Sequence, residues 1–432
     1  MREFFKMATA PDAAERDYFT DKSVLLDPYD FFEEIRARGP VVQLKNRDML
    51  FVTGFKEAVE VLLNKADFSS MIAGPGPAAP LPFEVEGDDI SAQVMAYEEA
   101  IRERDLMVNQ DGDFHLAARS LLNPLLVPSR LKANEAFMQE YADGMVRDLV
   151  AKGGCEVVNE VAVPYVTLVI ADLLGVPAED QKQFRDVIDQ GPPPGNMDDA
   201  ENTAQSGALQ FMIGYFMRYL GERRANPQGD IMTELALARY PDGTLPELVE
   251  PAKAAMFLFA AGQDTSAKLI GNAMRHLCED KDLQDRLRAD PSLVPAFLEE
   301  MLRLEGSTKM TARLAVRNTK IGDLDVPAGK RVFIGLAAAN RDPRRWDDPH
   351  AFELNRPRIK EHVAFGRGAH TCAGAPLARV EVRVLFERLL EQTSDISISE
   401  KHHGPPGNRD LNYEASYIIR GLENLHVVLR PR

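Results

Sequence analysis

The sequence has very few cysteines. Among its 432 residues only Cys155, Cys278 and Cys372 carry a thiol, and they lie far apart. A small, odd number of separated thiols excludes the disulfide framework that is typical of small secreted proteins. The chain is therefore expected in a reducing compartment, the cytoplasm, and each thiol becomes a candidate for chemistry.

A basic excess and a long apolar N-terminal segment are missing as well. Lys and Arg number 51 against 67 Asp and Glu, which gives a formal net charge of -16. Such a chain does not attract nucleic acid over a long range. The first 20 residues contain Arg2, Lys6, Asp12 and Asp17 and no stretch near the roughly 20 apolar residues that span a bilayer. We expect neither a signal peptide nor insertion into a membrane.

What the sequence has is apolar material for a large core, 45% of all residues, with no Gly/Ser linker or repeat to divide it. One large domain is expected. Hydrophobic periodicity predicts a fold that is mainly α with a minor β portion. The patterns indicate helix at 29–38, a hairpin at 41–53, helix at 58–63, a long loop at 69–92, helices from 114 to 304 with breaks at 153–156, 191–199 and 240–243, strand–turn–strand at 321–336, helix at 377–392, and strands at 416–419 and 426–429.

One thiol stands in a distinctive setting. In the segment 365–374, Phe-Gly-Arg-Gly-Ala-His-Thr-Cys-Ala-Gly, Cys372 ends a glycine-containing loop directly before a predicted helix. The loop amides and the positive end of the helix favour the thiolate, which is the form that binds metal. Glycines let the backbone approach a flat cofactor. A phosphate-cradling loop is the alternative, but Thr371 occupies the position where a dinucleotide fingerprint needs its third glycine.

This segment resembles the Phe-Gly-x-Gly-x-His-x-Cys-x-Gly signature of the cytochrome P-450 superfamily at every fixed position. The resemblance extends from about residue 28 to the C-terminus. It implies a single haem-enclosing domain over 28–432 with an N-terminal extension at 1–27, and haem b (iron protoporphyrin IX) as cofactor. It also implies Cys372 as axial ligand of the haem iron, with Phe365 and Gly374 against the haem. For Cys155 and Cys278 we expect structural, buried positions.

A second motif lies in the helical stretch 257–266. Ala261 and Gly262 make a small-residue step, followed by the polar pair Asp264 and Thr265. From these residues alone, a buried threonine bonded to the preceding turn, with Asp264 in a core salt bridge, explains the pair equally well. The stretch is similar to the Ala-Gly-x-Asp-Thr motif of the same superfamily. That resemblance implies a helix that opens over the haem, with Thr265 and Asp264 activating oxygen and delivering protons.

Further site residues follow from the same resemblance. The haem propionates need cationic or hydrogen-bonding partners, and the matching positions are His115, Arg119, Arg313 and His370. Each of these is also compatible with an ordinary surface or core role. Glu300, Arg303 and Arg356 match a buried, structural Glu-Arg-Arg network on the cysteine side of the haem.

The substrate site is implied on the opposite face of the haem. The matching positions, mostly apolar, are Met107, Val108, Phe257, Ala260, Ala261, Thr308, Met310, Tyr417 and Ile418. They suit a small apolar organic substrate such as a terpenoid, aromatic, steroid or fatty compound. Plain core packing is the alternative for each one.

Electrons must come from a separate protein, because three cysteines, one of them committed to haem, cannot build a four-thiolate iron–sulfur centre. The resemblance implies hydroxylation of the substrate with dioxygen, with electrons from NAD(P)H that pass through a ferredoxin or flavodoxin and its reductase. A basic docking surface is suggested by Arg344, Arg345, Arg367, Arg379 and Arg383. A peroxide-using haem-thiolate enzyme, a non-catalytic haem sensor and a helical interaction protein are the alternatives.

Overall fold

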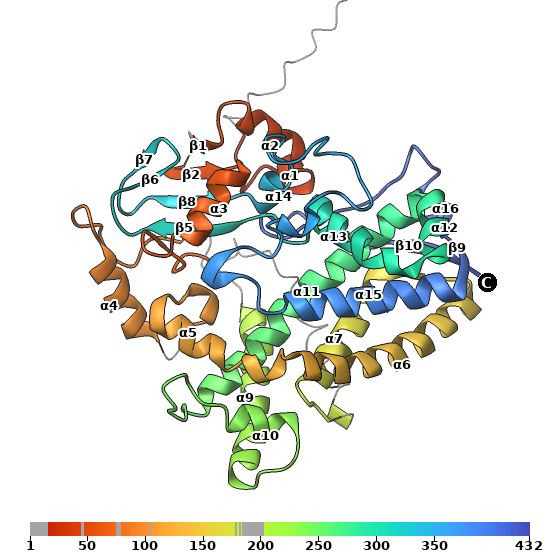
Figure 1. Cartoon of the computed structure of the whole chain (residues 1–432), viewed down its shortest axis with the longest axis horizontal. Coiled ribbons are helices and arrows are strands. Elements are labelled where there is room, and N and C mark those ends of the chain that lie inside the picture. The colour runs from red at the N-terminus through yellow and green to blue at the C-terminus, as the bar shows by residue number, and fades with distance from the viewer. Residues whose placement is uncertain are drawn as a thin grey trace, which may run out of the picture.

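The computed structural model describes residues 16–44, 47–74, 79–102, 105–177, 179–180, 183 and 203–432. Helices make up most of it, and three small sheets of five, three and two strands complete it. The larger sheet lies at one end of the molecule and the long helices fill the other (Figure 1). The predicted class, mainly α with minor β, is confirmed.

The five-stranded sheet has the order β1 (Val41–Gln43), β2 (Met49–Val52), β8 (Arg331–Ile334), β5 (Thr311–Ala315), β3 (Phe68–Ser69). The hairpin expected at 41–53 is present as the antiparallel pair of β1 and β2, and β2 continues in parallel with β8. The helices α2 (Tyr29–Arg36) and α3 (Phe55–Leu63) match the helices predicted on either side of it.

The strand–turn–strand prediction for 321–336 is only partly correct. Both strands form, as β7 (Leu324–Val326) and β8, but they do not pair with each other. Strand β7 pairs with β6 (Thr319–Ile321), while β8 lies between β2 and β5. The sequence signals of a turn do not specify which strand will be the partner, because that depends on the rest of the sheet.

The C-terminal sheet joins β4 (Gly154–Glu156), β10 (His426–Pro431) and β9 (Thr393–Ile398). The predicted helix break at 153–156 is thus a strand, and the strand at 426–429 is confirmed. The strand predicted at 416–419 is wrong: it contributes one isolated bridge, from Ile419 to Thr308. The Ser416 hydroxyl accepts hydrogen bonds from the amides of Ile418 and Ile419, so these donors are not free for a ladder.

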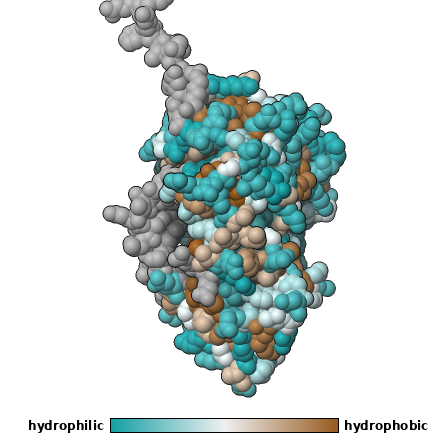
Figure 2. Space-filling model, turned by 90° about the vertical axis from the view of Figure 1, so that its left-hand side faces the viewer, coloured by the Kyte–Doolittle hydropathy of each residue, from teal (hydrophilic) through white to brown (hydrophobic). Residues whose placement is uncertain are grey.

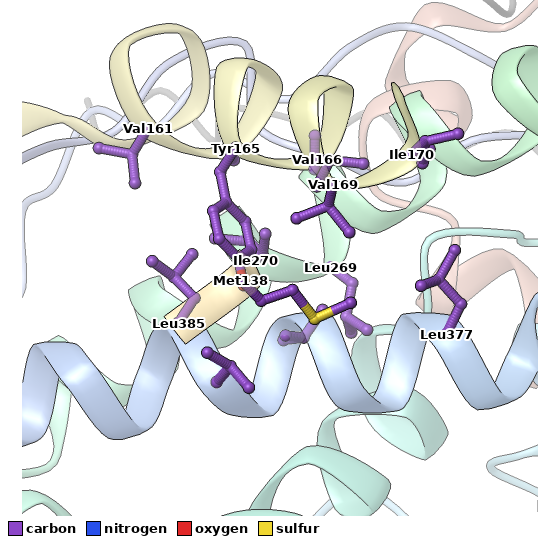
Figure 3. Close-up of a cluster of buried hydrophobic side chains, with 14 of the residues drawn as sticks. Met138, Val161, Tyr165, Val166, Val169, Ile170, Leu269, Ile270, Leu377 and Leu385 are labelled. Atoms are coloured by element: carbon purple, nitrogen blue, oxygen red, sulfur yellow. The ribbon is translucent and has the colours of Figure 1, made fainter. Parts of the chain in front are cut away.

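The helical part is built around α11 (Val249–Glu279), which packs against α7 (Val163–Leu173). A second layer pairs α6 (Pro128–Lys152) with α15 (Ala375–Gln392). Helix α6 starts with proline in its first turn and ends at Gly153 with φ of 80°, both favourable boundaries. Figure 3 shows side chains of α7 pointing toward those of α15, with Met138 of α6 between them.

The remaining helices surround this centre: α1 (Lys22–Leu26), α4 (Ser91–Ile101), α5 (Gly112–Ser120), α9 (Thr203–Ala225), α10 (Ile231–Ala236), α12 (Lys281–Ala289), α13 (Val294–Glu305), α14 (Leu336–Ala339) and α16 (Glu400–His403). Helix α4 was not predicted, because it carries no distinct apolar face. The break predicted at 191–199 lies outside the described residues. Residues 16–27, assigned to the N-terminal extension, pack into the core through Tyr18 and Phe19.

No helix in the described part of the chain is long and apolar enough to cross a membrane. On the face drawn in Figure 2, hydrophilic residues separate small groups of hydrophobic ones. The surface in this view therefore has no continuous apolar band.

A buried ion network connects α13 to the segment that leads to Cys372. Glu300 accepts hydrogen bonds from Arg303 at 2.9 and 2.7 Å and from Arg356 at 2.9 Å, and none of the three is more than 4% exposed. Arg303 also donates to the carbonyls of Asn340 and Pro349. The three residues that the resemblance assigned to a structural network are therefore in contact.

The cysteine loop packs directly on the end of α3. Gly366 and Gly368 have φ of 68° and 74°, and a Cβ on Gly368 would lie 2.5 Å from the carbonyl oxygen of Leu62. The Cys372 amide donates to the Phe365 carbonyl at 2.9 Å, which closes the loop. Only glycine at position 368 permits both this backbone conformation and this close approach.

We expect Glu300→Ala to lower the free energy of unfolding by about 3–5 kcal/mol, because two buried guanidinium groups lose their counter-ion. The matched control is Glu353→Ala, which removes a 51% exposed carboxylate 3.3 Å from Arg356. It should cost less than about 1 kcal/mol. Urea unfolding of the two variants measures both values, and equal losses would refute a stabilising role for the network.

Gly368→Ala should destabilise the protein more than Gly407→Ala. Both glycines have positive φ, but a Cβ on Gly407 has nothing within 4 Å. The control then carries only the left-handed backbone cost of about 1–2 kcal/mol, and overlap with α3 adds about 1–3 kcal/mol at position 368. Thermal unfolding of both variants tests this difference. Similar melting temperatures would show that α3 can shift to accommodate the Cβ without loss of stability.

Candidate functional site

A cavity of about 200 Å³ lies between α11 and the cysteine loop. Its walls come from three parts of the chain that are distant in sequence, 107–122, 257–266 and 365–381, and they are mostly apolar. The lining residues are Met107, Val108, His115, Arg119, Leu122, Phe257, Leu258, Ala261, Gly262, Thr265, Ser266, Phe365, His370, Thr371, Cys372, Ala373, Gly374, Leu377, Ala378 and Glu381. The structure thus brings together the cysteine loop, the polar pair region of α11 and the His-x-x-x-Arg segment.

Cys372 is exposed toward this cavity, whereas Cys278 is buried and Cys155 is half-buried. Burial raises the pKa of the Cys372 thiol, while the amides of Gly374 and Ala375 and the charge of Arg119 lower it. The predicted stabilisation by amides is present, but burial outweighs it. A metal cation bound at the sulfur would favour the thiolate further, since coordinated thiols lose their proton.

Two histidines meet at the edge of the cavity. The rings of His115 and His370 lie 4.0 Å apart, and His370 Nε2 lies 3.3 Å from Asp111 Oδ1. Burial, together with His370 and Arg119, lowers the pKa of His115 to about 4. His115 is therefore neutral at neutral pH and can donate one hydrogen bond to an anion.

Two arginines beside the histidines have no carboxylate partner among the described residues. Arg119 lines the cavity without any ion pair in that part of the chain, and Arg313 donates to the carbonyl of Ala312 at 2.7 Å. Burial lowers the pKa of Arg313 to about 10. Arg313 is not in the cavity wall, yet its charge acts on His115. Unpaired, partly buried cations at this edge fit a ligand that carries two carboxylates, as haem does.

The polar pair Asp264 and Thr265 on α11 has the structural contacts that the sequence analysis gave as the alternative to a catalytic role. Thr265 Oγ1 donates to the Ala261 carbonyl at 2.9 Å, and Asp264 lies 4.0 Å from Lys268. The helix continues from Val249 to Glu279, so the local opening implied by the resemblance is absent from this structure. Thr265 nevertheless lines the cavity. Burial raises the pKa of Asp264 to about 6, and its Oδ2 has no hydrogen-bond partner in the described residues.

Gly262 allows α11 and α7 to pack closely at this point. A Cβ there would lie 2.9 Å from Cδ1 of Ile170. The small-residue step in the sequence thus has a packing explanation besides any function. The same close contact fixes the position of the neighbouring cavity residues Ala261 and Thr265.

Sequence reasoning missed a buried carboxyl in the cavity wall. Glu381 of α15 is 1% exposed, and burial raises its pKa to about 7 while Ser266 of α11 hydrogen-bonds to it. Its Oε2 has no partner among the described residues. The signal available in the sequence was an acidic residue on the apolar face of the helix that follows the cysteine.

Only part of the expected substrate wall borders the cavity. Met107, Val108, Phe257 and Ala261 line it; Ala260, Thr308, Met310, Tyr417 and Ile418 do not. Met310 and Tyr417 belong to the apolar cluster around the five-stranded sheet, where the Tyr417 ring lies 5.5 Å from that of Phe19. For these two side chains, the core-packing alternative describes the observed contacts.

The arginines expected to form a basic docking surface are already engaged. Their partners are Glu57 and Asp342 for Arg344, Glu361 for Arg345, Glu299 for Arg379, Glu135 and Glu387 for Arg383, and the carbonyls of Glu361 and His362 for Arg367. The acidic partners neutralise much of the local positive charge. A strong basic patch is therefore not evident at these five positions.

Comparison with known proteins gives consistent matches. The family model "Cytochrome P450" matches residues 206–403. "Cytochrome P450 144" of Mycobacterium tuberculosis is 30% identical over 431 residues, which are 98% of this chain and 93% of the relative. "Vitamin D(3) 25-hydroxylase" of Pseudonocardia autotrophica is 30% identical over 331 residues, 76% of this chain and 78% of the relative.

The fold agrees as well. The solved structure of substrate-free CYP150A6 from Mycobacterium marinum shares 45% sequence identity with a TM-score of 0.90, covering 97% of this chain and 99% of the other. The resemblance first seen in the segment around Cys372 is confirmed. With relatives of this similarity over nearly its full length, the chain belongs to the cytochrome P450 family of monooxygenases.

Proposed function

We propose that the protein binds haem b through Cys372 and hydroxylates an apolar organic molecule with dioxygen. The observation that carries this proposal is the cavity itself: a thiol opens into mostly apolar walls beside Arg119, which has no carboxylate partner among the described residues. When bound, haem with a thiolate ligand supplies the reductive activation of dioxygen and the insertion of one oxygen atom into a C–H bond.

In this proposal different residues bind the iron and the propionates of the cofactor. Cys372 would hold the haem iron through its sulfur, and Arg119, Arg313, His115 and His370 would bind the propionates by charge and hydrogen bonds. Gly374 leaves the space beside the sulfur open, since a Cβ there would lie 3.9 Å from Sγ. Phe365 gives the adjoining wall an apolar surface.

Thr265 and Asp264 hold and move protons on the opposite wall. Thr265 can release the Ala261 carbonyl and turn its hydroxyl into the cavity that it already lines. Asp264, with its pKa raised to about 6 by burial, exchanges a proton readily near neutral pH. Lys268 connects it to Glu414 of the C-terminal segment, because the Lys268 ammonium pairs with both carboxylates. The series Asp264, Lys268 and Glu414 thus connects the cavity to a partly exposed carboxylate.

The substrate class follows from the wall and from a relative. Met107, Val108, Phe257 and Ala261 offer apolar contact, which suits a terpenoid, aromatic, steroid or fatty compound. The relative named for hydroxylation of vitamin D(3) supports a large apolar skeleton. Electrons are proposed to come from NAD(P)H through a separate ferredoxin or flavodoxin with its reductase.

We expect the reduced, carbon monoxide-treated protein to show a strongly red-shifted, thiolate-type Soret band that is absent from Cys372→Ser. Cys155→Ser and Cys278→Ser are the matched controls and should keep the band, because neither thiol lines the cavity. Absorption spectra of the four proteins decide the ligand. A haem-free protein, or an unchanged band in Cys372→Ser, would overturn the proposal.

Thr265→Ala should reduce the ratio of product formed to NAD(P)H consumed by about tenfold or more, because proton delivery loses its hydroxyl. Thr265→Ser retains a hydroxyl and should keep most of the coupling. Cofactor consumption, product and released peroxide are measured with a surrogate ferredoxin and reductase. Full coupling in Thr265→Ala would favour the peroxide-using alternative, and no cofactor consumption by the wild type would favour a sensor.

A further inference from the structure

A second, smaller cavity of about 20 Å³ adjoins the first. Its lining residues are Asp105, Leu106, Met107, Gln110, Ala118, Glu250, Lys253, Ala254 and Phe257. Met107 and Phe257 line both cavities and so form their shared wall. We call this second cavity the annex; its wall includes three ionisable side chains, Asp105, Glu250 and Lys253, and the amide of Gln110.

The loop that carries the annex is firmly held. Asp105 Oδ1 accepts hydrogen bonds from the Leu106 amide and from Asn109 Nδ2, both at 2.9 Å. Asn109 Oδ1 in turn accepts from the Gly74 amide at 2.8 Å. The position of Gln110 is therefore set by neighbours that are themselves hydrogen-bonded, as a binding group requires.

Gln110 is the group in the annex that lacks a partner. It is 4% exposed, and its Oε1 is buried without a hydrogen bond from the described residues. A buried amide oxygen without a hydrogen bond destabilises the site. Lys253 lines the same cavity but does not supply the missing bond; its ammonium donates to the Arg102 carbonyl at 3.2 Å and to Glu250 at 3.1 Å. An outside donor would remove this destabilisation.

Size and charge restrict what the donor can be. The volume of about 20 Å³ admits one group the size of a water molecule. The wall of the annex contains two carboxylates, Asp105 and Glu250, and one ammonium, Lys253, so its net charge is negative. A carboxylate on the ligand would therefore be repelled. A single neutral hydroxyl meets both conditions, since it is small and donates one hydrogen bond.

We propose that the substrate is a hydroxylated apolar molecule whose hydroxyl group enters the annex and donates to Gln110 Oε1. This inference rests on the proposed function and adds a specificity-determining residue to it. Met107 is the part of the shared wall that moves aside, because its unbranched thioether chain is half-buried and has three rotatable bonds. The apolar skeleton then remains in the main cavity beside Phe257.

The test is a spectral titration of the haem-loaded protein with matched pairs of probes: testosterone and the same steroid without its hydroxyl group, and dodecanol and dodecane. Binding is followed by the spin-state change of the Soret band. In the wild type, at least one alcohol should bind about tenfold more tightly than its parent, the equivalent of one net hydrogen bond. Gln110→Met, which keeps the side-chain length, should remove this preference.

Met107→Ala is the control, because it alters the shared wall and should change the affinity of both members of a pair by a similar factor. The inference is overturned if the preference persists in Gln110→Met, if the wild type shows none, or if no probe binds. In each of these cases an intact carbon monoxide band shows that the proposed haem-thiolate function stands. Loss of that band in the wild type would overturn both.

Discussion

The buried carboxylate of Glu300 is the contact on which the cysteine side of the molecule depends. It holds Arg303 from its own helix and Arg356 from the segment before the cysteine loop, and Arg303 also binds carbonyls of that segment. Three charges without access to water are stable only when all are present. The network therefore positions the segment that precedes the cysteine loop. The packing of Gly368 on α3 positions the loop itself.

The arginines around the cavity differ in whether they have a carboxylate partner. Of the five arginines near the cysteine loop, Arg344, Arg345, Arg379 and Arg383 pair with carboxylates, which neutralise their charge. Arg119 and Arg313 are different, since neither has such a partner among the described residues. The contrast separates arginines that stabilise the fold from arginines suited to binding an anionic cofactor.

Thr265 and Asp264 on α11 can take part in the proposed proton delivery, but in this structure both side chains make other contacts. Thr265 is bonded back to Ala261, and Asp264 lies near Lys268 in an unbroken helix. Such contacts hold the two side chains at little cost, and a hydroxyl bonded to the backbone can exchange partners easily. The buried Glu381 and Ser266 extend the set of polar groups in the same wall.

The sequence by itself determined the family, the ligand candidate and the local elements with clear patterns. The hairpin at 41–53 and the helix after Cys372 could be predicted because periodicity is a local property, whereas the contacts of Glu300 were implied by the family resemblance. Tertiary structure alone decided the partner of β7, the loss of a strand at 416–419, and which expected pocket residues border the cavity. It also decided that Gln110 and Glu381 are buried, each with a side-chain oxygen that has no hydrogen-bond partner among the described residues. Burial and pairing arise between segments distant in sequence, so no local pattern encodes them.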